Sequence, residues 1–440
     1  MTEFANMDKA AHAAKTPSDK IKIYREITRR AQIDDQFRNE IDQERFMNSS
    51  RAFMHLLCKE PRDSGLKIAI LGYKVPLMEK WDPFDTIKGL PGSEECAVYA
   101  SEELVRRGHH VTVYMNPPDE SIWKSPFSNP RWLPEDLFHV SENKDYYDLI
   151  LMWRRFDVNT GRRRSKIVFF WPHDSPAFPP GTIFPNFDGV CILSEHHRRQ
   201  FQEVFSRFDD VPYTICGNGI VPAQFTSPMS FTNPYSIGYF SNYSRGLAAL
   251  ILIWPEIKEE FPEATLSICY GRETWNTMPP YLLKLLIAKI EEYKDLGVTE
   301  HGKVGHQQLA SIMQSTSIWA YPCNSLGETY CITAVKCQAA GCIPVTTRIG
   351  ALNETVHPDA PKSSNITNIE SIQEYKSILL QTLRRTRDSS PDQLSQERLK
   401  YRLFALQWSW SACIDKWLEL FHRVNSIEKG LKFGFNLCDK

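Results

Sequence analysis

Short apolar strands and helices alternate regularly through the second half of the chain, and this alternation restricts the possible folds more than any other feature. Each expected strand is an apolar run that ends in polar or glycine residues, as in strands buried on both faces of a parallel sheet. The expected strands cover 235–241, 264–271, 298–304, 318–323 and 342–347, with helical segments between them. The pattern predicts a doubly wound α/β domain, with helices on both faces of its sheet.

The first half of the chain has the same texture from Lys67 onward. An apolar run at 67–73, a glycine-containing loop, a helical segment at 96–108 and a second strand at 109–115 make one βαβ unit. Further apolar runs follow at 146–153, 166–174, 187–195 and 211–219. We therefore expect two Rossmann-like domains in tandem. The carboxyl ends of their strands should face a shared central cleft, which is the usual ligand position in this architecture.

The expected domain boundaries follow from these patterns. Residues 1–62 carry mixed charges with apolar residues every three or four positions, which predicts an N-terminal helical extension. The first Rossmann-like domain is expected at 63–222, the second at 223–395, and further helices at 396–440. The overall prediction is an α/β protein with two doubly wound parallel-sheet domains preceded by that extension.

Charge and composition disfavour several kinds of partner. The formal net charge is -1, which gives no long-range attraction for polyanions, so nucleic acid is not an expected partner. The longest apolar stretches, 149–153 and 167–171, are far shorter than the roughly 20 residues that cross a bilayer, so no membrane span is expected. The basic run Arg162–Arg164 leaves a peripheral membrane contact open, although a solvated loop face is the simpler interpretation.

The start of the chain and its cysteines bear on the cellular compartment. Residues 1–15 carry acidic side chains and lack a continuous apolar core, so they do not look like a secretory signal, and we expect a cytoplasmic protein. The 11 cysteines are scattered and form no CxxC pair or zinc-type spacing. We expect most of them to be reduced and buried as small hydrophobic residues.

Gly89 and Gly92 lie in a loop between an expected strand and an expected helix. Without side chains their backbone can approach a ligand closely, and the N–H groups that open a helix favour anions. The spacing is not GxGxxG, and no acidic residue follows at the distance that reads a ribose, so nicotinamide binding is disfavoured. A flexible turn without a ligand is an equally good interpretation.

The first strand of the second domain ends in a polar cluster, FSNYSRGL, which contains Ser241, Asn242, Ser244 and Arg245. Arg245 stands at the expected start of a helix, where a guanidinium adds a bidentate cation to a terminus that already attracts anions. This combination suits a diphosphate. The alternatives are that the two serines cap the helix and that Arg245 pairs with a surface carboxylate.

A second candidate group follows the strand at 318–323. The segment SLGETYCITAVKC places Glu328 at the expected start of a helix, with Ser325 and Gly327 in the preceding loop. A carboxylate in this position can accept hydrogen bonds from sugar hydroxyls. It can also simply complement the helix dipole, and the local sequence does not decide between these roles.

Together these segments resemble the family-4 glycosyltransferases, which are retaining enzymes with the GT-B fold. The run from Glu328 to Val345 resembles the E-x7-E helix and following strand of that family, and FSNYSRGL resembles its phosphate-binding turn in the variant S-x-x-x-R-G-L. GLPGSEECAVYASEELVRRG resembles the glycine loop and first helix of the N-terminal domain. QWSWSACIDKWLELF resembles the C-terminal helices, which cross back onto that domain. The resemblance spans Lys67 to Phe421.

The resemblance implies a transferase that takes a nucleoside-diphosphate sugar as donor and needs neither cofactor nor metal, in keeping with the absence of a D-x-D triplet. The acceptor is an unidentified glycan, protein or small molecule. Arg245 would contact the donor diphosphate, Gly92 would lie beside it, and Glu328 would hold hydroxyls of the donor sugar. His173, in FFWPHD, falls where the family often has a histidine close to the transferred sugar, and a histidine bonded to Asp174 is the alternative. Glu328, His173 and Arg245 form the expected catalytic group. The expected donor site also includes Ser241, Asn242, Ser244, Gly327, Thr329, Tyr330 and Lys336.

One position departs from the family pattern. The second glutamate of E-x7-E, which in relatives typically binds the ribose hydroxyls of the nucleotide, is Lys336 in this chain. A protonated lysine cannot accept hydrogen bonds from a diol, so the expected ribose contact is lost or replaced. Two other hypotheses stay open: a catalytically weak or inactive binder of nucleotide sugars, and a sugar-nucleotide epimerase with the GT-B fold.

Overall fold

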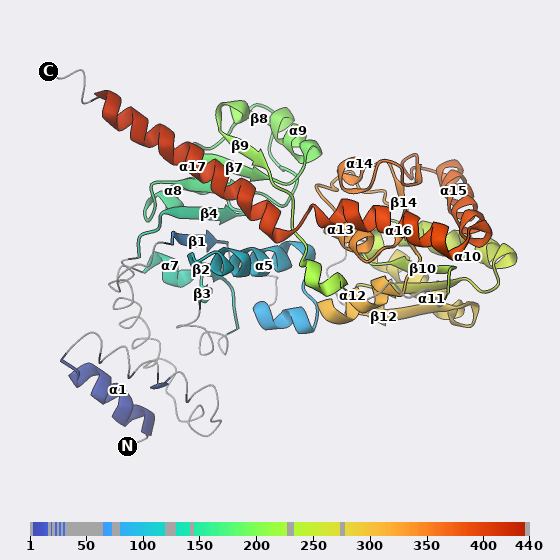
Figure 1. Cartoon of the computed structure of the whole chain (residues 1–440), viewed down its shortest axis with the longest axis horizontal. Helices are drawn as coiled ribbons and strands as arrows, with labels where there is room; N and C mark the ends of the chain where they lie inside the picture. The colour runs from blue at the N-terminus through green and yellow to red at the C-terminus, as the bar shows by residue number, and fades with distance from the viewer. Residues whose placement is uncertain are drawn as a thin grey trace.

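The chain folds into two α/β domains, each built on one parallel sheet (Figure 1). The structure is a computed structural model that describes residues 3–15, 65–72, 80–118, 129–140, 145–226, 233–272 and 278–435, together with single positions between 19 and 30. Most of the expected extension at 1–62 lies outside these residues. Within it, helix α1 covers Glu3–Ala13.

The first domain contains a seven-stranded parallel sheet in the order β3-β2-β1-β4-β5-β7-β9. Its strands are β1 (Lys67–Leu71), β2 (His110–Met115), β3 (Arg131–Pro134), β4 (Leu149–Trp153), β5 (Val168–Trp171), β7 (Gly189–Ile192) and β9 (Tyr213–Ile215). A separate two-stranded ribbon joins β6 (Thr182–Ile183) to β8 (Phe205–Ser206). The apolar runs predicted as strands are confirmed. The edge strand β3 is an addition that the sequence did not predict, because it is short and ends in a proline.

Helix α5 connects β1 to β2 and carries the glycine loop of the first domain. It covers Gly92–Arg106, so it begins earlier than expected, and Gly92 is its first residue. Gly108 follows the helix with φ of 87°, a left-handed conformation that glycine adopts readily at the end of a helix. The other helical segments of this domain are η1 (Pro83–Ile87), α7 (Asp136–His139), α8 (Val158–Arg162), α9 (Glu195–Val204) and η2 (Phe208–Asp210).

The second domain contains a six-stranded parallel sheet in the order β12-β11-β10-β13-β14-β15. Its strands are β10 (Ser236–Tyr239), β11 (Thr265–Cys269), β12 (Val298–Gly302), β13 (Ile318–Tyr321), β14 (Ile343–Thr347) and β15 (Lys362–Ser363). Numbered within the domain, this order is 3-2-1-4-5-6, the order of dinucleotide-binding folds. The predicted doubly wound domain is therefore confirmed.

Helices cover both faces of this sheet and then return to the first domain. They are α10 (Leu247–Glu260), α11 (Pro280–Glu292), α12 (His306–Gln314), α13 (Ile332–Ala339), α14 (Leu352–Thr355), α15 (Ile369–Asp388), α16 (Pro391–Leu406) and α17 (Trp410–Phe435), with short 3-10 turns η3 (Pro222–Phe225), η4 (Tyr243–Arg245) and η5 (Lys294–Leu296). Helix α17 runs along the first domain, where it contacts α5, β7 and β9 (Figure 1). Its Trp417 ring lies edge-on to Trp171 of β5, with 4.6 Å between the centroids.

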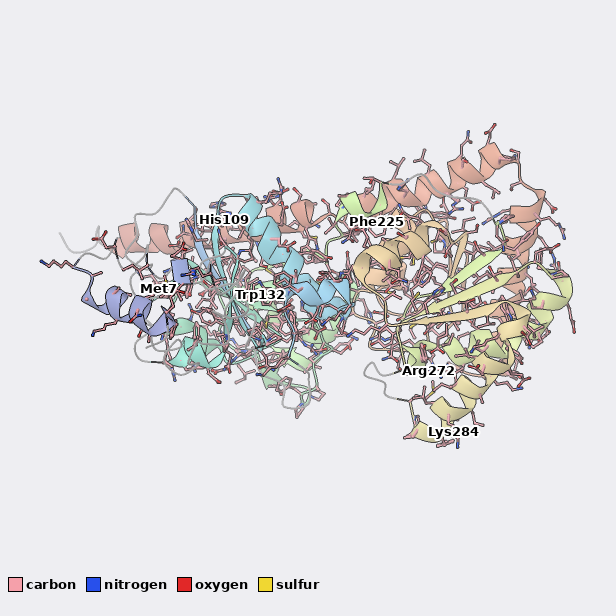
Figure 2. All side chains as sticks on the ribbon, turned by 90° about the horizontal axis from the view of Figure 1, so that it is seen from below. Met7, His109, Trp132, Phe225, Arg272 and Lys284 are labelled. Atoms are coloured by element: carbon pink, nitrogen blue, oxygen red, sulfur yellow. The ribbon has the colours of Figure 1, made fainter. Side chains whose placement is uncertain are left out.

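The hydrophobic core is continuous across the two domains. One cluster of buried side chains includes Ile68 and Cys96 of the first domain and Ile237 and Val335 of the second. Figure 2 shows Trp132 in the first domain, Arg272 in the second, and Phe225 near the junction between them. The domains are therefore packed against each other in this structure. Among the described residues, no helix is both long enough and apolar enough to cross a membrane.

Candidate functional site

The candidate site lies where the strand order of the second sheet reverses. Strands β10 and β13 are neighbours there, and their connections leave the sheet in opposite directions. In open parallel sheets this point forms a crevice at the carboxyl ends of the strands, and ligands bind in it. The polar cluster that contains Arg245 follows β10, and the loop that contains Glu328 follows β13.

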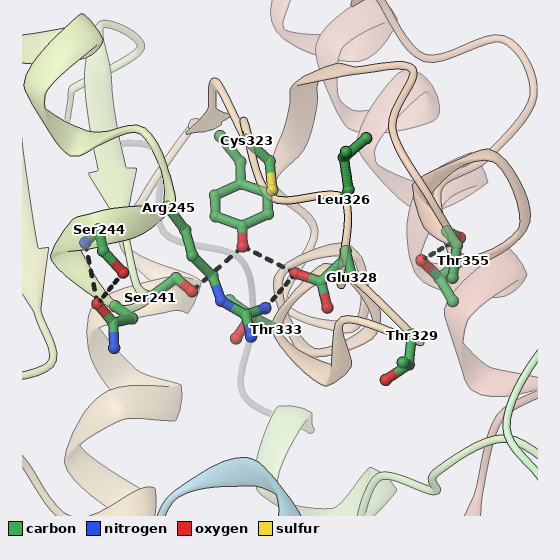
Figure 3. A network of polar contacts seen from close by, with 12 residues as sticks. Ser241, Ser244, Arg245, Cys323, Leu326, Glu328, Thr329, Thr333 and Thr355 are labelled. Carbon is green, nitrogen blue, oxygen red and sulfur yellow. Dashed lines mark hydrogen bonds and ion pairs between the residues drawn. The ribbon is translucent and has the colours of Figure 1, made fainter. Parts of the chain in front are cut away.

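Arg245 and Glu328 meet at this point (Figure 3). Arg245 donates from Nη1 to Glu328 Oε2 at 2.5 Å, and Tyr321 at the end of β13 donates from its hydroxyl to the same oxygen at 2.9 Å. The Glu328 side chain is buried, whereas the Arg245 side chain is 34% exposed. The adjacent Glu328 carboxylate raises the pKa of Arg245 above its usual range. The two groups that the resemblance assigned to diphosphate and sugar thus lie in contact.

The polar residues before Arg245 mainly organise the turn between β10 and α10. Asn242 Oδ1 accepts hydrogen bonds from the backbone N–H of Ser244 at 2.9 Å and from its hydroxyl at 2.8 Å. Ser241 lies 3.3 Å from the Tyr321 hydroxyl, measured between oxygens. Gly246 has φ of 104°, and a side chain there would collide with the Pro322 carbonyl oxygen. Asn242, rather than either serine, therefore caps the turn that aims Arg245 at the crevice.

The expected position of Glu328 at the start of a helix is wrong. Helix α13 begins at Ile332, so Glu328 lies in the loop that precedes it. Cys331 has φ of 64°, a left-handed conformation that interrupts the helical path just before Ile332. Glu328 is therefore held by Arg245 and Tyr321 instead of by the N–H groups of the helix.

His173 belongs to the first domain, where it follows strand β5. Its ring packs against Trp171 and Trp153, with centroid distances of 4.8 and 5.8 Å. Burial and the nearby Arg154 cation hold the pKa of His173 well below its usual range, so the imidazole is neutral at neutral pH. The alternative contact with Asp174 is not formed, because that carboxylate accepts hydrogen bonds from Arg154 at 2.6 and 2.9 Å.

Thr329 and Tyr330 turn toward the first domain, away from Arg245. The Thr329 hydroxyl donates to the His173 carbonyl oxygen at 3.1 Å, and its own carbonyl accepts from Ser194 at 2.7 Å. The Tyr330 ring lies against Gly217, close enough that a side chain there would collide with it. These two residues of the expected donor site therefore hold the domains together.

The two expected glycines lie at the same domain boundary. A side chain built at Gly92 would come within 3.0 Å of Ile332, the first residue of α13. A side chain at Gly327 would lie 3.7 Å from the Ser175 hydroxyl of the first domain. The starts of α5 and α13 therefore approach closely, with Gly92 at the point of contact.

A cavity of about 100 Å³ lies between the domains beside this contact. It opens at the carboxyl ends of β10, β11 and β12 and against the glycine loop and first turn of α5. Residues from both domains line it: Gly89, Leu90, Pro91, Gly92, Glu95, Phe240, Cys269, Tyr270, Lys303, Val304, His306, Leu309, Ile332, Thr333 and Lys336. The expected site residues Gly92 and Lys336 therefore share one cavity.

Lys336 bonds to a carboxylate of the opposite domain. Its Nζ donates to Glu95 Oε2 at 2.6 Å, and the two side chains are 9% and 1% exposed. His306 Nε2 lies 3.1 Å from the same oxygen. It also accepts from the Leu90 N–H at 3.1 Å, while Nδ1 lies 2.8 Å from the Tyr99 hydroxyl. Burial lowers the pKa of His306.

The sequence reasoning missed Glu95, His306 and Tyr321. Glu95 stands three residues after Gly92, in the first turn of a helix, where an acidic residue is usually interpreted as a partner of the helix dipole. Tyr321 ends an apolar strand and so reads as a core residue. Among the described residues, no group of three or more His, Cys, Asp or Glu side chains is arranged to hold a metal ion.

Comparison of the fold with solved structures gives GT-B glycosyltransferases. The catalytic domain of starch synthase IV from Arabidopsis thaliana, bound to ADP and acarbose, matches 82% of this chain and 100% of its own, with TM-score 0.57 and 10% identity. Sucrose-phosphate synthase from Thermosynechococcus elongatus matches 82% and 100%, with TM-score 0.59 and 14% identity. A glycosyltransferase of avilamycin A biosynthesis matches 82% and 98%, with TM-score 0.55 and 14% identity.

These similarities show that the chain has the GT-B fold, as the sequence predicted. At such low identity they show the fold alone. No protein-family profile and no curated protein sequence matches the chain.

Proposed function

We propose that this chain is a glycosyltransferase that moves a sugar from a nucleoside-diphosphate sugar to a hydroxyl-bearing acceptor. One observation carries the proposal. A partly exposed guanidinium and a buried carboxylate, from Arg245 and Glu328, meet at the strand-order reversal, beside a cavity that both domains line. The solved structure of the starch synthase domain, which has the same fold, was bound to ADP, and this supports a nucleoside diphosphate as the ligand.

The proposed reaction breaks the bond between the anomeric carbon of the sugar and the β-phosphate oxygen. A bond forms between that carbon and the acceptor oxygen, the acceptor proton passes to the departing phosphate, and nucleoside diphosphate is released. Negative charge grows on the phosphate as the bond breaks, so a fixed cation beside it lowers the barrier. We assign that cation to Arg245.

Arg245 can bind a diphosphate and keep its ion pair with Glu328. A guanidinium carries five N–H donors, and the bond from Arg245 to the Glu328 carboxylate uses one of them, on Nη1. The Arg245 side chain is 34% exposed, so its other N–H groups can donate to a bound diphosphate. Glu328 keeps a second oxygen, Oε1, that can accept from a sugar hydroxyl. The pair thus works as a positioned cation and a positioned acceptor.

His173 contributes from the opposite domain. Its lowered pKa keeps the imidazole neutral, and its Nε2 has no hydrogen-bond partner among the described residues. A neutral ring nitrogen can exchange a hydrogen bond with a sugar hydroxyl without adding charge next to the developing oxocarbenium ion. This supports the placement of His173 beside the transferred sugar.

The donor enters when the domains separate. The cavity of about 100 Å³ is smaller than the roughly 300–1,000 Å³ of pockets that hold organic ligands. The nucleoside is assigned to the ends of β10, β11 and β12, next to Phe240 and Tyr270.

We further propose a retaining, metal-independent reaction of the family-4 type, in which Arg245 and the helix starts neutralise the leaving phosphate.

The test is release of nucleoside diphosphate from a panel of UDP-, ADP- and GDP-sugars, first without an acceptor and then with candidate acceptors. Arg245→Ala and Glu328→Ala are each expected to lower the best rate at least roughly 100-fold, the scale of losing one charge-stabilising group. Arg245→Lys keeps the charge but loses the planar fork, so it should fall between wild type and alanine. Arg384→Ala removes an arginine that pairs with Glu260 on the outer helices and should leave the rate unchanged.

Near-normal turnover in both alanine variants would refute the assignment of the site. Binding of donor without any release of nucleoside diphosphate would identify a binding protein instead. Conversion of the sugar in the absence of any acceptor would identify an epimerase. Release that requires added magnesium and is abolished by a chelator would refute the metal-independent reaction.

A further inference from the structure

Glu95 carries a buried carboxylate oxygen that the described residues do not satisfy. Its side chain is 1% exposed and lines the cavity between the domains. Oε2 accepts from Lys336 Nζ at 2.6 Å, whereas Oε1 has no hydrogen-bond partner among the described residues. A buried acceptor without a donor is costly, because it has lost its hydration without replacement. A ligand that binds in the cavity and donates a hydrogen bond to Oε1 explains why this atom has no donor from the protein residues described.

Glu95 can supply the hydrogen-bond acceptor for ribose hydroxyls that Lys336 cannot supply. Residue 336 lies on α13, and the resemblance described above expects a ribose-binding carboxylate there. A lysine offers only donors, but this one holds the carboxylate of Glu95 beside it, so an acceptor stands at the same wall of the cavity. The acceptor now comes from the first domain, 241 positions earlier in the chain.

We propose that Glu95 is the residue that recognises the ribose hydroxyls of the donor nucleotide, with Lys336 as its positioning residue. This inference rests on the proposed function, because it assigns the nucleoside to the cavity. One or both hydroxyls of the vicinal diol donate to Oε1, to which none of the described residues donates. The Lys336 ammonium stays on Oε2, where it fixes the carboxylate and balances its charge near the anionic diphosphate.

The origin of Glu95 has a consequence for domain closure. Phe240 and Tyr270 line the nucleoside side of the cavity from the second domain, whereas Glu95 belongs to α5 of the first. The contact between carboxylate and ribose therefore forms only when the domains are closed. The ribose hydroxyls are therefore recognised in the same step in which the two domains close.

The test compares the dissociation constants of UDP, ADP and GDP with those of their 2′-deoxy and 3′-deoxy counterparts, measured by calorimetry on the full chain. Wild-type protein should bind the best ribonucleotide roughly 10- to 100-fold more tightly than at least one deoxy form, the range of a hydrogen bond to a charged group. Glu95→Gln should reduce this ratio to below roughly threefold. Glu102→Gln changes an exposed carboxylate on the same helix and should keep the wild-type ratio.

A second variant covers the case in which Glu95→Gln fails to fold because it leaves Lys336 unpaired. Glu95→Gln combined with Lys336→Gln removes both charges and should also lose the preference for ribose. Retention of the wild-type preference in either folded variant overturns the inference. Equal binding of ribo and deoxy forms by wild-type protein overturns it as well, while the proposed function stands. If none of the nucleoside diphosphates binds, the proposed function itself fails.

Discussion

Replacing Lys336 by methionine should destabilise the protein because it leaves the Glu95 carboxylate buried without its cation. The two charged groups are 2.6 Å apart and almost fully buried. With an effective dielectric constant near 20, two unit charges at this distance attract by about 6 kcal/mol. Removing both ions from water costs several kcal/mol each, so the pair contributes little net stability. Removing one partner costs much more, because the other keeps its desolvation penalty.

The expected magnitudes define a double-mutant cycle. Lys336→Met and Glu95→Gln should each lower the free energy of unfolding by about 3–5 kcal/mol, the cost of breaking a buried ion pair. The variant with both changes has no unpaired charge, so its loss should be smaller than the sum of the single losses by at least about 2 kcal/mol. The measurement is urea-induced unfolding followed by tryptophan fluorescence.

The control cycle uses Lys376→Met and Glu256→Gln. Lys376 and Glu256 form an ion pair between α15 and α10, and the Glu256 side chain is 47% exposed. Their coupling should be below about 1 kcal/mol, as is usual for exposed pairs. A coupling between Glu95 and Lys336 no larger than this control would refute the reasoning, because it would mean that the two side chains do not meet across the domain boundary.

Other residues give independent tests. Gly305→Ala places a side-chain carbon 2.0 Å from the Ile87 carbonyl oxygen of the opposite domain, so solution scattering should show a larger radius of gyration; an unchanged radius would contradict the closed contact. Burial lowers the pKa of His197 to about 4, below its unfolded value near 6.5, so stability is full above pH 6.5 and falls as the pH drops toward 4. Between pH 7.5 and 5.0, His197→Gln should therefore lose about 2 kcal/mol less stability in urea unfolding than wild type, and an equal loss would refute this. Tyr321→Phe removes a hydrogen bond to the Glu328 carboxylate and should lower the free energy of unfolding by about 2 kcal/mol in the same assay, whereas a loss below about 0.5 kcal/mol would show that the bond is not formed.

The fold could be predicted because its signals are local. Apolar runs such as Ile68–Leu71 and Ile343–Val345 are buried on both sides, and helical segments separate them, so each βαβ unit is specified by adjacent residues. Right-handed crossovers then bring the carboxyl ends of the strands to one edge. Residues that follow a strand, such as Arg245 and Glu328, are thereby placed at that edge before any tertiary contact is known.

Local details of the site were harder to predict. The sequence from Glu328 onward favours a helix, yet the left-handed backbone of Cys331 delays the helix to Ile332. The serines near Arg245 are good helix caps, but Asn242 caps the short turn η4, and Gly246 stands at the N-cap of α10 without a side-chain cap. In each case two arrangements differ by a single backbone conformation or hydrogen bond, and local sequence preferences do not distinguish them.

The sequence by itself determined the alternation of the main strands and helices, the two-domain architecture, and the edge of the sheet where Arg245 and Glu328 lie. Only the tertiary structure decided that Arg245 and Glu328 pair with each other, and that Lys336 meets Glu95 across the domain boundary. Periodicity and motif spacing report on neighbours along the chain. An ion pair between residues 241 positions apart depends on how the two domains are oriented, and that orientation results from the whole interface between them.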